Sequence, residues 1–227
     1  MAETSQRRRG GLMRMAEATP PDRDRYVDFL RGFSIVVVVL GHWLMGMDLT
    51  LLSMIGCLAR PTSGRILLHG RNLSGLPERF LTGVRRQTFG FTFQRFNLIQ
   101  GLSVLDNVML PAFPLAPDHA ELVARAQALL DQFGLAPKAA ARVEWLSGGE
   151  AQRTAICRAL INDPEVLIAD EPTANLDSHL AQDFLTLLEG LRAAGRTLIL
   201  SSHDAEVFEA PCVDRVVTLR DGAVVDG

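Results

Sequence analysis

The sequence is poor in cysteine and in net charge, and each shortage excludes a class of protein. Three cysteines in 227 residues, Cys57, Cys157 and Cys212, lack the close spacing of a zinc site, so we interpret them as reduced cytosolic thiols used in packing. A formal net charge of −3 gives no case for nucleic-acid binding. The length suffices for one α/β domain with a sizeable core, or for one domain with an appendage.

The longest uncharged run is short for a membrane span. Residues 32–47 carry no formal charge, but a spanning helix needs about 20 apolar residues, and Asp48 interrupts the run before apolar character resumes. Two interpretations therefore stay open: a buried parallel strand, favoured by the β-branched residues 35–39, or a membrane helix. Seven arginines against five acids before Asp48 favour a cytoplasmic, membrane-proximal N-terminus, with a membrane anchor in the second interpretation.

The chain divides by composition into a tail, an apolar segment and a body. Residues 1–24 are polar and arginine-rich, and we expect a disordered basic tail there. Residues 25–48 form the apolar segment. Residues 49–227 form the body, with a helical subdomain expected at about 100–160.

Short apolar strands alternate with amphipathic helices along the body. This alternation predicts an α/β fold with a mainly parallel sheet and helices on both faces. A capping box at Asp118 and Glu121 predicts the start of a helix that ends at Gly134. The remaining elements are expected as strands over 65–69, 87–93, 166–169 and 197–200, a helix through 155–160, a helix through 180–191, and a terminal hairpin over 216–225.

Polar side chains follow three of these strands. Asp170 and Glu171 end the apolar strand at 166–169, where Asp170 suits Mg²⁺ and Glu171 suits a base that orients an attacking water. Gln94 follows the strand at 87–93, and its amide suits a metal ion or its water. His203 follows the strand at 197–200, and its imidazole suits a γ-phosphate and the water.

A serine and two glycines open the helix through 155–160. Ser147, Gly148 and Gly149 offer a hydroxyl and approachable backbone N–H groups at a helix start, which predicts an anion site. The alternative for a bare glycine pair is a turn that caps a helix. The following residues 150–153 make the motif far more specific than that.

From about Thr50 to Gly227 the sequence resembles the ATP-binding subunit of an ABC transporter. The sequence patterns of residues 61–64, 89–99 and 107–111 are similar to those of the family branch that serves lipoprotein release and macrolide export. Five motifs stand in the family's order: Gln94 (Q-loop), Leu146–Glu150 (signature), Val166–Pro172 (Walker B and its glutamate), Ala174–Asp177 (D-loop) and His203 (switch histidine).

The resemblance implies a P-loop NTPase-like ABC core that uses ATP and Mg²⁺, with Asp177 as the D-loop aspartate. It implies a head-to-tail dimer of the chain with itself or with a homologous ATPase subunit. In that dimer Ser147, Gly148 and Gly149 of one subunit close over ATP bound to the other. It further implies a transmembrane permease partner, contacted through the surface around Gln94, and a place at the cytoplasmic face of the inner membrane.

The phosphate loop of this family, G-x-x-x-x-G-K-[ST], has no lysine here. Gly41 and Gly46 have the right spacing, but aligned on them the lysine becomes Met47 and the hydroxyl Asp48. Aligned on Thr50 and the two leucines after it, the same positions become Asp48 and Leu49. Both registers put Asp48 near the triphosphate, where two like charges about 4 Å apart repel by several kcal/mol at an effective dielectric of ~20. The family's first two strands also lack a clear counterpart, so we expect a truncated core.

Residues 23–43 resemble a different family, the first membrane helix of the acyltransferase-3 proteins. There an arginine and a histidine with ten residues between them begin the acyl-transfer site, and Arg31 and His42 match them. The other membrane helices of that family are absent, and these two residues alone could not build such a site. The simplest interpretation is a chimaera joined near residues 47–50.

Three functions stay open at this stage. The chain is an ABC transporter ATP-binding subunit that couples ATP binding and hydrolysis to export or lipoprotein release through the degenerate loop Gly41, Gly46 and Thr50. Alternatively, it is a hydrolysis-deficient subunit that acts as an interaction module and completes a partner's site. The third hypothesis is a membrane-anchored, acyltransferase-like fragment.

Overall fold

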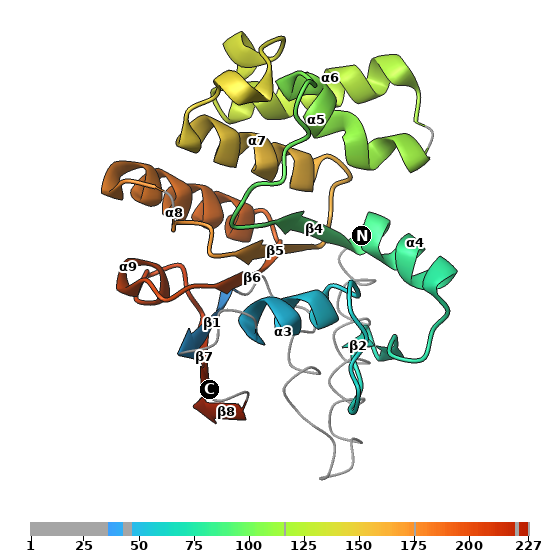
Figure 1. Cartoon of the computed structure of the whole chain (residues 1–227), viewed down its shortest axis with the longest axis vertical. Helices are drawn as coiled ribbons and strands as arrows, with labels where there is room; N and C mark the ends of the chain where they lie inside the picture. The colour runs from blue at the N-terminus through green and yellow to red at the C-terminus, as the bar shows by residue number, and fades with distance from the viewer. Residues whose placement is uncertain (1–35, 43–46, 116, 175, 221–222, 227) are drawn as a thin grey trace, which may run out of the picture.

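A six-stranded sheet runs through the part of the chain that the computed structural model describes, residues 36–42, 47–115, 117–174, 176–220 and 223–226 (Figure 1). The predicted tail at 1–24, Arg31 and Gly46 lie outside those residues. The strand order is β4-β5-β6-β1-β7-β8, with only β8 antiparallel to its neighbour. The strands are β1 (Val36–His42), β4 (Phe89–Thr92), β5 (Val166–Asp170), β6 (Thr197–Ser201), β7 (Arg215–Arg220) and β8 (Ala223–Asp226).

The apolar run before Asp48 contributes a central strand. β1 pairs in parallel with β6 on one side and β7 on the other, with Val38 opposite Leu200 and Val216. A membrane helix is therefore wrong for residues 36–42, because their backbone is paired along both edges. A β-branched run is typical of a parallel strand inside a sheet. Within the described ranges, no helix combines the length and the apolar character that crossing a bilayer requires.

Helices occupy the connections between the strands. A small antiparallel hairpin, β2 (Leu67–Leu68) with β3 (Arg71–Asn72), lies beside the main sheet. The α-helices are α3 (Met47–Ile55), α4 (Glu78–Thr88), α5 (Val104–Met109), α6 (His119–Gln132), α7 (Gly148–Leu160), α8 (Ser178–Ala193) and α9 (Ala205–Phe208), and the 3-10 turns are η1 (Leu110–Leu115), η2 (Ala136–Lys138) and η3 (Val143–Trp145).

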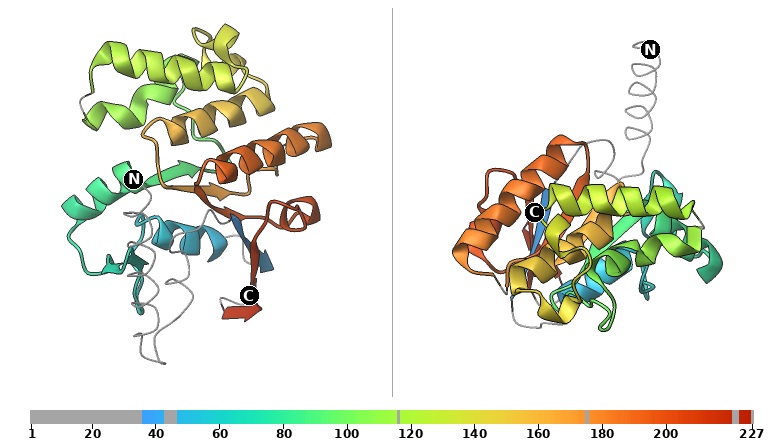
Figure 2. Two further views of the ribbon diagram at one scale, coloured as in Figure 1. Left: turned by 180° about the vertical axis from the view of Figure 1, so that it is seen from behind. Right: turned by 90° about the horizontal axis from the view of Figure 1, so that it is seen from above.

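Alternate residues of β5 enter two different cores. Leu167 and Ala169 join a cluster with residues of α5, α6, α7 and α8, whereas Ile168 joins Leu52 of α3 and Leu81 of α4. This two-residue period is that of a strand buried on both faces. The sheet thus carries helices on both faces, as predicted, with α3 and α8 on opposite sides of it (Figures 1 and 2).

The predicted strands and helices are present, although the strand expected over 65–69 is reduced to Leu67–Leu68, and the largest difference lies around α4. The strand expected over 87–93 begins only at Phe89, because Gln87 and Thr88 end α4. That helix was not predicted, and it starts at Pro77 without a side-chain cap. Half of the capping box predicted for α6 is present, since Asp118 Oδ1 accepts from the N–H groups of Ala120 at 2.9 Å and Glu121 at 3.1 Å. The return bond from Asp118 N to the Glu121 side chain is not formed within the described ranges.

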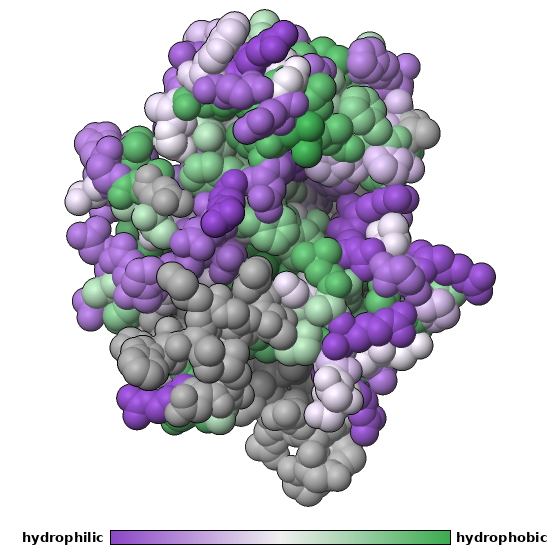
Figure 3. All heavy atoms as spheres, viewed as in Figure 1, coloured by the Kyte–Doolittle hydropathy of each residue, from purple (hydrophilic) through white to green (hydrophobic). Residues whose placement is uncertain are grey.

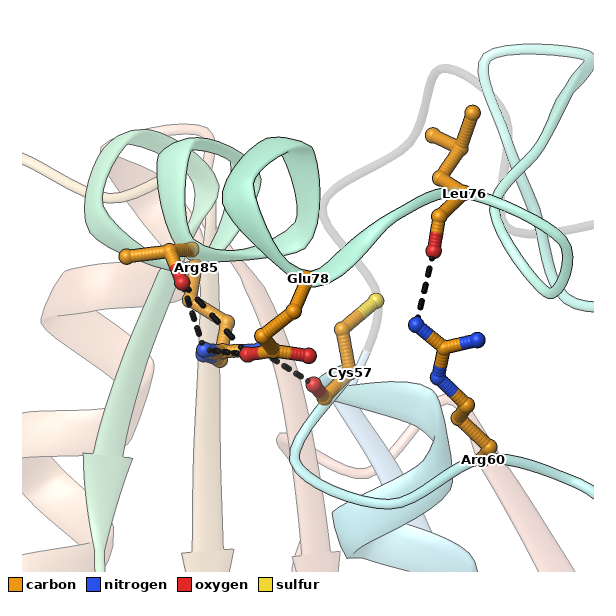
Figure 4. A network of polar contacts seen from close by, with 6 residues as sticks. Cys57, Arg60, Leu76, Glu78 and Arg85 are labelled. Carbon is orange, nitrogen blue, oxygen red and sulfur yellow. Dashed lines mark hydrogen bonds and ion pairs between the residues drawn. The ribbon is translucent and has the colours of Figure 1, made fainter.

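Side chains from α4 hold the far end of α3 (Figure 4). Arg85 Nη1 donates to the carbonyl of Cys57 at 2.7 Å, just past the last turn of α3, and Arg85 also pairs with Glu78. Arg60 Nη2 donates to the carbonyl of Leu76 at 3.0 Å. A cation beside the last carbonyls of a helix is favourable. The end of α3 is therefore fixed, and its first turn follows the carboxyl end of β1 along the chain.

Candidate functional site

The predicted polar residues meet at one edge of the sheet. Because β4, β5, β6 and β1 are parallel, the residues that follow them lie at the same carboxyl edge. The chain leaves β1 toward β4 and leaves β6 toward β7, in opposite directions across the sheet. Such a switch point is the usual ligand crevice of an open α/β sheet.

Asp170 is held in place by a serine from the next strand. Asp170 ends β5 opposite Ser201, the last residue of β6, and the hydroxyl of Ser201 donates to Asp170 Oδ1 at 2.7 Å. Ser201 is buried and Asp170 is half-buried. A small hollow beside Asp170 is also lined by Ser53 of α3 and Thr92 of β4. Asp170 thus borders the hollow that Ser53 of α3 also lines.

Glu171 has a strained backbone. Its φ of 44° lies in the left-handed region, which is uncommon for a residue other than glycine. Its N–H donates to both the carbonyl and the hydroxyl of Ser201, each at 3.1 Å. Strain of this kind persists where the surroundings over-determine the conformation, and it concentrates at functional sites.

His203 forms an ion pair with Glu171. His203 Nδ1 lies 2.9 Å from Glu171 Oε1, with the histidine side chain 65% exposed and the glutamate 19% exposed. The hydrogen bond to Glu171, and then its charge, raise the pKa of His203 above the usual value. The predicted base and the predicted switch histidine are therefore in direct contact.

The second oxygen of Glu171 is buried and has no hydrogen-bond partner within the described ranges. A buried carboxylate oxygen is costly unless something donates to it. This orphaned acceptor and the carboxylate of Asp170 fit a site for a water molecule and a hard cation such as Mg²⁺. Protein ligands alone do not form a cage there, since no group of three or more His, Cys, Asp or Glu gathers within the described ranges.

The helix that carries the predicted anion site begins with a capping box. The hydroxyl of Ser147 accepts from Glu150 N at 3.3 Å, and Glu150 Oε2 accepts from Ser147 N at 2.9 Å. These bonds leave the N–H groups of Gly148 and Gly149 as first-turn donors without a partner inside the helix. Ser147 and Gly148 are exposed. The start of α7 therefore presents donors to an approaching anion.

Gly149 has a packing role that its motif did not predict. It is buried, and a Cβ added there would lie 2.8 Å from Leu180 Cδ1 of α8. A glycine at 149 is thus required by the packing of α7 against α8, while its N–H stays one of the first-turn donors. Gln152 of the same helix donates to the carbonyl of Pro172, directly after Glu171. Asp177 accepts from Leu180 N at 3.0 Å and caps α8.

The start of α3 brings no cation to this edge. Gly41 lies in β1 opposite Leu219, Thr50 lies within α3, and the helix begins at Met47 with Asp48 as its second residue. The chain contains a single lysine, Lys138, whose Nζ lies 3.4 Å from Glu150 Oε1 in the helical part. The sequence therefore has no lysine available for a phosphate loop.

Sequence reasoning missed the residues that position the predicted ones. The sequence motifs assign no role to Ser201, and they include Glu150 and Gln152 only as residues that follow the serine and glycines. A small hydroxyl residue at the end of a strand next to a paired-acid strand is a signal that could have identified Ser201. Gln94 follows β4 as predicted and is exposed.

The family model described as ABC transporter matches residues 49–174. The match begins directly after Met47 and Asp48. Among curated proteins, the chain is 47% identical over 177 residues to the macrolide export ATP-binding/permease protein MacB of Rhodospirillum rubrum. It is 45% identical over 205 residues to the pyoverdine export ATP-binding/permease protein PvdT of Pseudomonas syringae pv. syringae.

These alignments cover 78% and 88% of the chain but 27% and 31% of the relatives, so the chain spans about a third or less of their length. Among solved structures, the dimeric structure of MJ0796, a bacterial ABC transporter cassette, matches with a TM-score of 0.78 and 36% identity. That match covers 86% of this chain and 85% of the other. A second structure of that cassette holds ADP and Pi in a post-hydrolysis state, with the same scores.

Proposed function

This chain belongs to the ABC transporter family, and we propose that it is the ATP-binding domain of an exporter whose own phosphate site is impaired. The exporter assignment is supported by the names of its relatives, which export macrolides and pyoverdine. The carboxyl edge that joins Asp170, Glu171, Ser201 and His203 supports a role in nucleotide chemistry. On the basis of family membership, we further propose that the chain couples ATP hydrolysis to export and that its partner is a transmembrane permease.

The start of α7 is the observation that carries the proposal. Ser147 and Gly148 are exposed, and the first N–H groups of α7 point out of the helix without internal partners. In a head-to-tail dimer like those of this family, this surface closes over the ATP of the second subunit. The solved MJ0796 relative is dimeric. We expect the same assembly here, with the chain itself or with a homologous ATPase subunit.

The phosphate-binding site that this chain itself would contribute to the proposed dimer is impaired. We propose the glycine register, in which Met47 replaces the lysine and Asp48 replaces the hydroxyl, because α3 begins at Met47, directly after Gly46 in the sequence. An acid in the first turn of a helix interacts favourably with the helix dipole, and its negative charge opposes an anionic ligand at the same helix start. We infer that ATP in cis is repelled there.

The residues at the carboxyl edge of the sheet remain compatible with binding of Mg²⁺ and water. Asp170 and the amide of Gln94 would hold Mg²⁺, which would neutralise phosphate charge when nucleotide is bound. Glu171 orients a water through its unpartnered oxygen, and His203 keeps the carboxylate of Glu171 in position. These are proposals for a site that a partner's signature residues would complete.

The permease contact is proposed for the helical part around Gln94. Hydrophobic side chains gather over the helical part at the top of Figure 3. The exposed large hydrophobic residues of this part include Ile99 at 50%, Phe113 at 48% and Leu115 at 44%. Exposed apolar groups of this kind indicate a protein or membrane contact. We propose the cytoplasmic face of the inner membrane as the location.

Acyl transfer is the least supported of the three functions. His42 is the last residue of β1, inside a parallel sheet, rather than part of a membrane helix. The resemblance of residues 23–43 to acyltransferase-3 proteins supports a chimaeric origin of the segment that ends near Asp48. In this chain, we propose that the segment replaces the strand before the phosphate loop.

A complementation experiment tests the proposal. One copy carries Met47→Lys and Asp48→Ser, which recreate the phosphate-loop consensus on the glycine register, together with Ser147→Arg, which blocks its signature. The other copy is the natural chain, with an intact signature and no loop lysine. We expect ATP hydrolysis to appear only when the two copies are mixed, because only the mixed dimer contains a complete site.

Two controls make the outcome decisive. Copies with Met47→Lys and Asp48→Ser alone should hydrolyse ATP as homodimers, which shows that the rebuilt loop works. Introducing Ser147→Arg into the natural chain should abolish the activity of the mixture. Activity of the natural chain alone, or a mixture no faster than its separate components, would contradict the proposal.

A further inference from the structure

The segment after Gln94 contains two consecutive strained residues. We call residues 94–101 the Gln94 loop. Phe96 and Asn97 have φ values of 53° and 49°, both in the left-handed region, although neither is glycine. A conformation of this kind persists only when the surrounding structure holds it. Two neighbouring residues in it require an external restraint.

Arg158 supplies that restraint from the last turn of α7. Its Nη1 donates to the carbonyl of Asn97 at 2.6 Å, and its Nη2 donates to the carbonyl of Phe96 at 2.5 Å. The planar fork of a guanidinium suits two adjacent acceptors, which an ammonium group cannot bridge in the same way. The half-buried position of Arg158 lowers its pKa below the usual value, because desolvation penalises the charged form.

The Gln94 loop is also tied to the other end of α7. The N–H of Gly101 donates to Glu144 Oε1 at 2.5 Å, and Glu144 belongs to η3, three residues before Ser147. Between these ties, the buried side chain of Asn107 accepts from Ile99 N at 2.7 Å and donates to Ile99 O at 3.1 Å. The loop is thus bonded beside the start of α7 and at its last turn.

We propose that Arg158 is a positioning residue that makes the Gln94 loop and the signature helix α7 move as one unit. The inference rests on the proposed function, since it concerns how the surface around Gln94 sets the position of Ser147 and Gly148 over a partner's nucleotide. A movement of the loop is passed to α7 through the two carbonyls held by Arg158. Without that fork, the loop relaxes out of the left-handed conformation and the two parts separate.

Tryptic cleavage of the full chain measures the restraint directly. The bond between Arg95 and Phe96 lies at the start of the strained pair, and Arg95 is exposed. We expect Arg158→Met to speed cleavage of this bond about tenfold or more, because two charge-assisted hydrogen bonds are lost. Arg158→Lys should behave like Arg158→Met.

Arg196→Met is the matched control. Arg196 also donates to a backbone carbonyl, that of Pro164, and pairs with Asp163, away from the Gln94 loop. We expect this variant to lose stability without faster cleavage after Arg95. Cleavage that is unchanged in Arg158→Met, or equally faster in Arg196→Met, would overturn the inference.

The mixed dimer described above tests the functional consequence. With Arg158→Ala in the natural copy, we expect kcat at the partner's site to fall about tenfold with KM unchanged, and millimolar guanidinium to restore part of the rate. An unchanged kcat in a mixture that Ser147→Arg abolishes would overturn the inference and leave the proposed function intact. If Ser147→Arg has no effect, the proposed function fails, and the tryptic result alone still decides the restraint.

Discussion

Single residues at the carboxyl edge of the sheet set the charge that a ligand meets there. Asp170, Glu171 and His203 were identified from sequence because each follows an apolar strand and because they stand in the family's order with the other motifs. Their contacts could not be predicted. The bond from Ser201 to Asp170 and the positive φ of Glu171 depend on the register of β5 with β6, which sequence alone does not set.

The Glu171–His203 pair predicts a pH dependence. A pKa of His203 raised above about 6.5 means that the pair stabilises the fold fully below that pH. The contribution is lost as pH rises through the raised pKa, and exposure of the histidine keeps it small. In an NMR titration of the imidazole nitrogens, Glu171→Gln should lower the pKa of His203, whereas Glu165→Gln should not change it. Equal values in the natural chain and in Glu171→Gln would show that the pair does not form.

Ser201 is expected to stabilise the fold more than its neighbour Ser202. Ser201→Ala removes the hydroxyl shared by Asp170 and the N–H of Glu171, and such a loss costs about 1–3 kcal/mol. Ser202 is equally buried, but among the described residues the hydrogen bond recorded for its hydroxyl is the one that it accepts from Asp204 N at 3.1 Å. Urea denaturation of Ser201→Ala and Ser202→Ala should therefore show the larger loss for Ser201→Ala. A larger loss for Ser202→Ala would contradict this assignment.

At the scale of elements, the strands were easier to predict than the helix α4. Apolar runs at 166–169 and 197–200 are short and bounded by turn signals, which favours strands. Helix α4 has no capping side chain, and its boundary signals, Pro77 with Glu78 at the start and two arginines in the last turn, were not used in the prediction. The apolar run before Asp48 left a strand and a membrane helix open, and only its pairing with β6 and β7 decides between them.

Proline at the centre of β1 tests that assignment. Val38 pairs with Leu200 and Val216, so Val38→Pro removes a ladder hydrogen bond inside the sheet and should destabilise the fold by about 3 kcal/mol or more. Val38→Ala separates the loss of the side chain from the loss of the hydrogen bond and should cost less. Denaturation of both variants measures the difference, and equal stabilities would contradict a central strand at 36–42.

At the scale of the whole molecule, the residues of the family motifs lie around one sheet edge, and our proposal depends on the absence of one lysine from the sequence before Thr50. Helix α7 begins at the serine and glycines of the motif, the paired acids end β5, and the histidine that follows β6 contacts Glu171; their roles remain predictions. The helix α3 follows β1 as a phosphate-loop helix would, but its first residues are Met47 and Asp48. The fold can therefore be kept while phosphate binding is lost. Other apolar residues can form the strand and the helix, but they cannot supply the positive charge of the lysine.

The most direct test is a calorimetric titration of Mg²⁺-ATP into the natural chain and into the Met47→Lys/Asp48→Ser variant. Removing one repulsion and adding one attraction should tighten binding by at least about 100-fold, from a natural affinity weaker than about 1 mM. Asp48→Lys/Leu49→Ser, the other register, is the matched control and should gain less. Binding of ATP by the natural chain as tight as that of the Met47→Lys/Asp48→Ser variant would contradict the account.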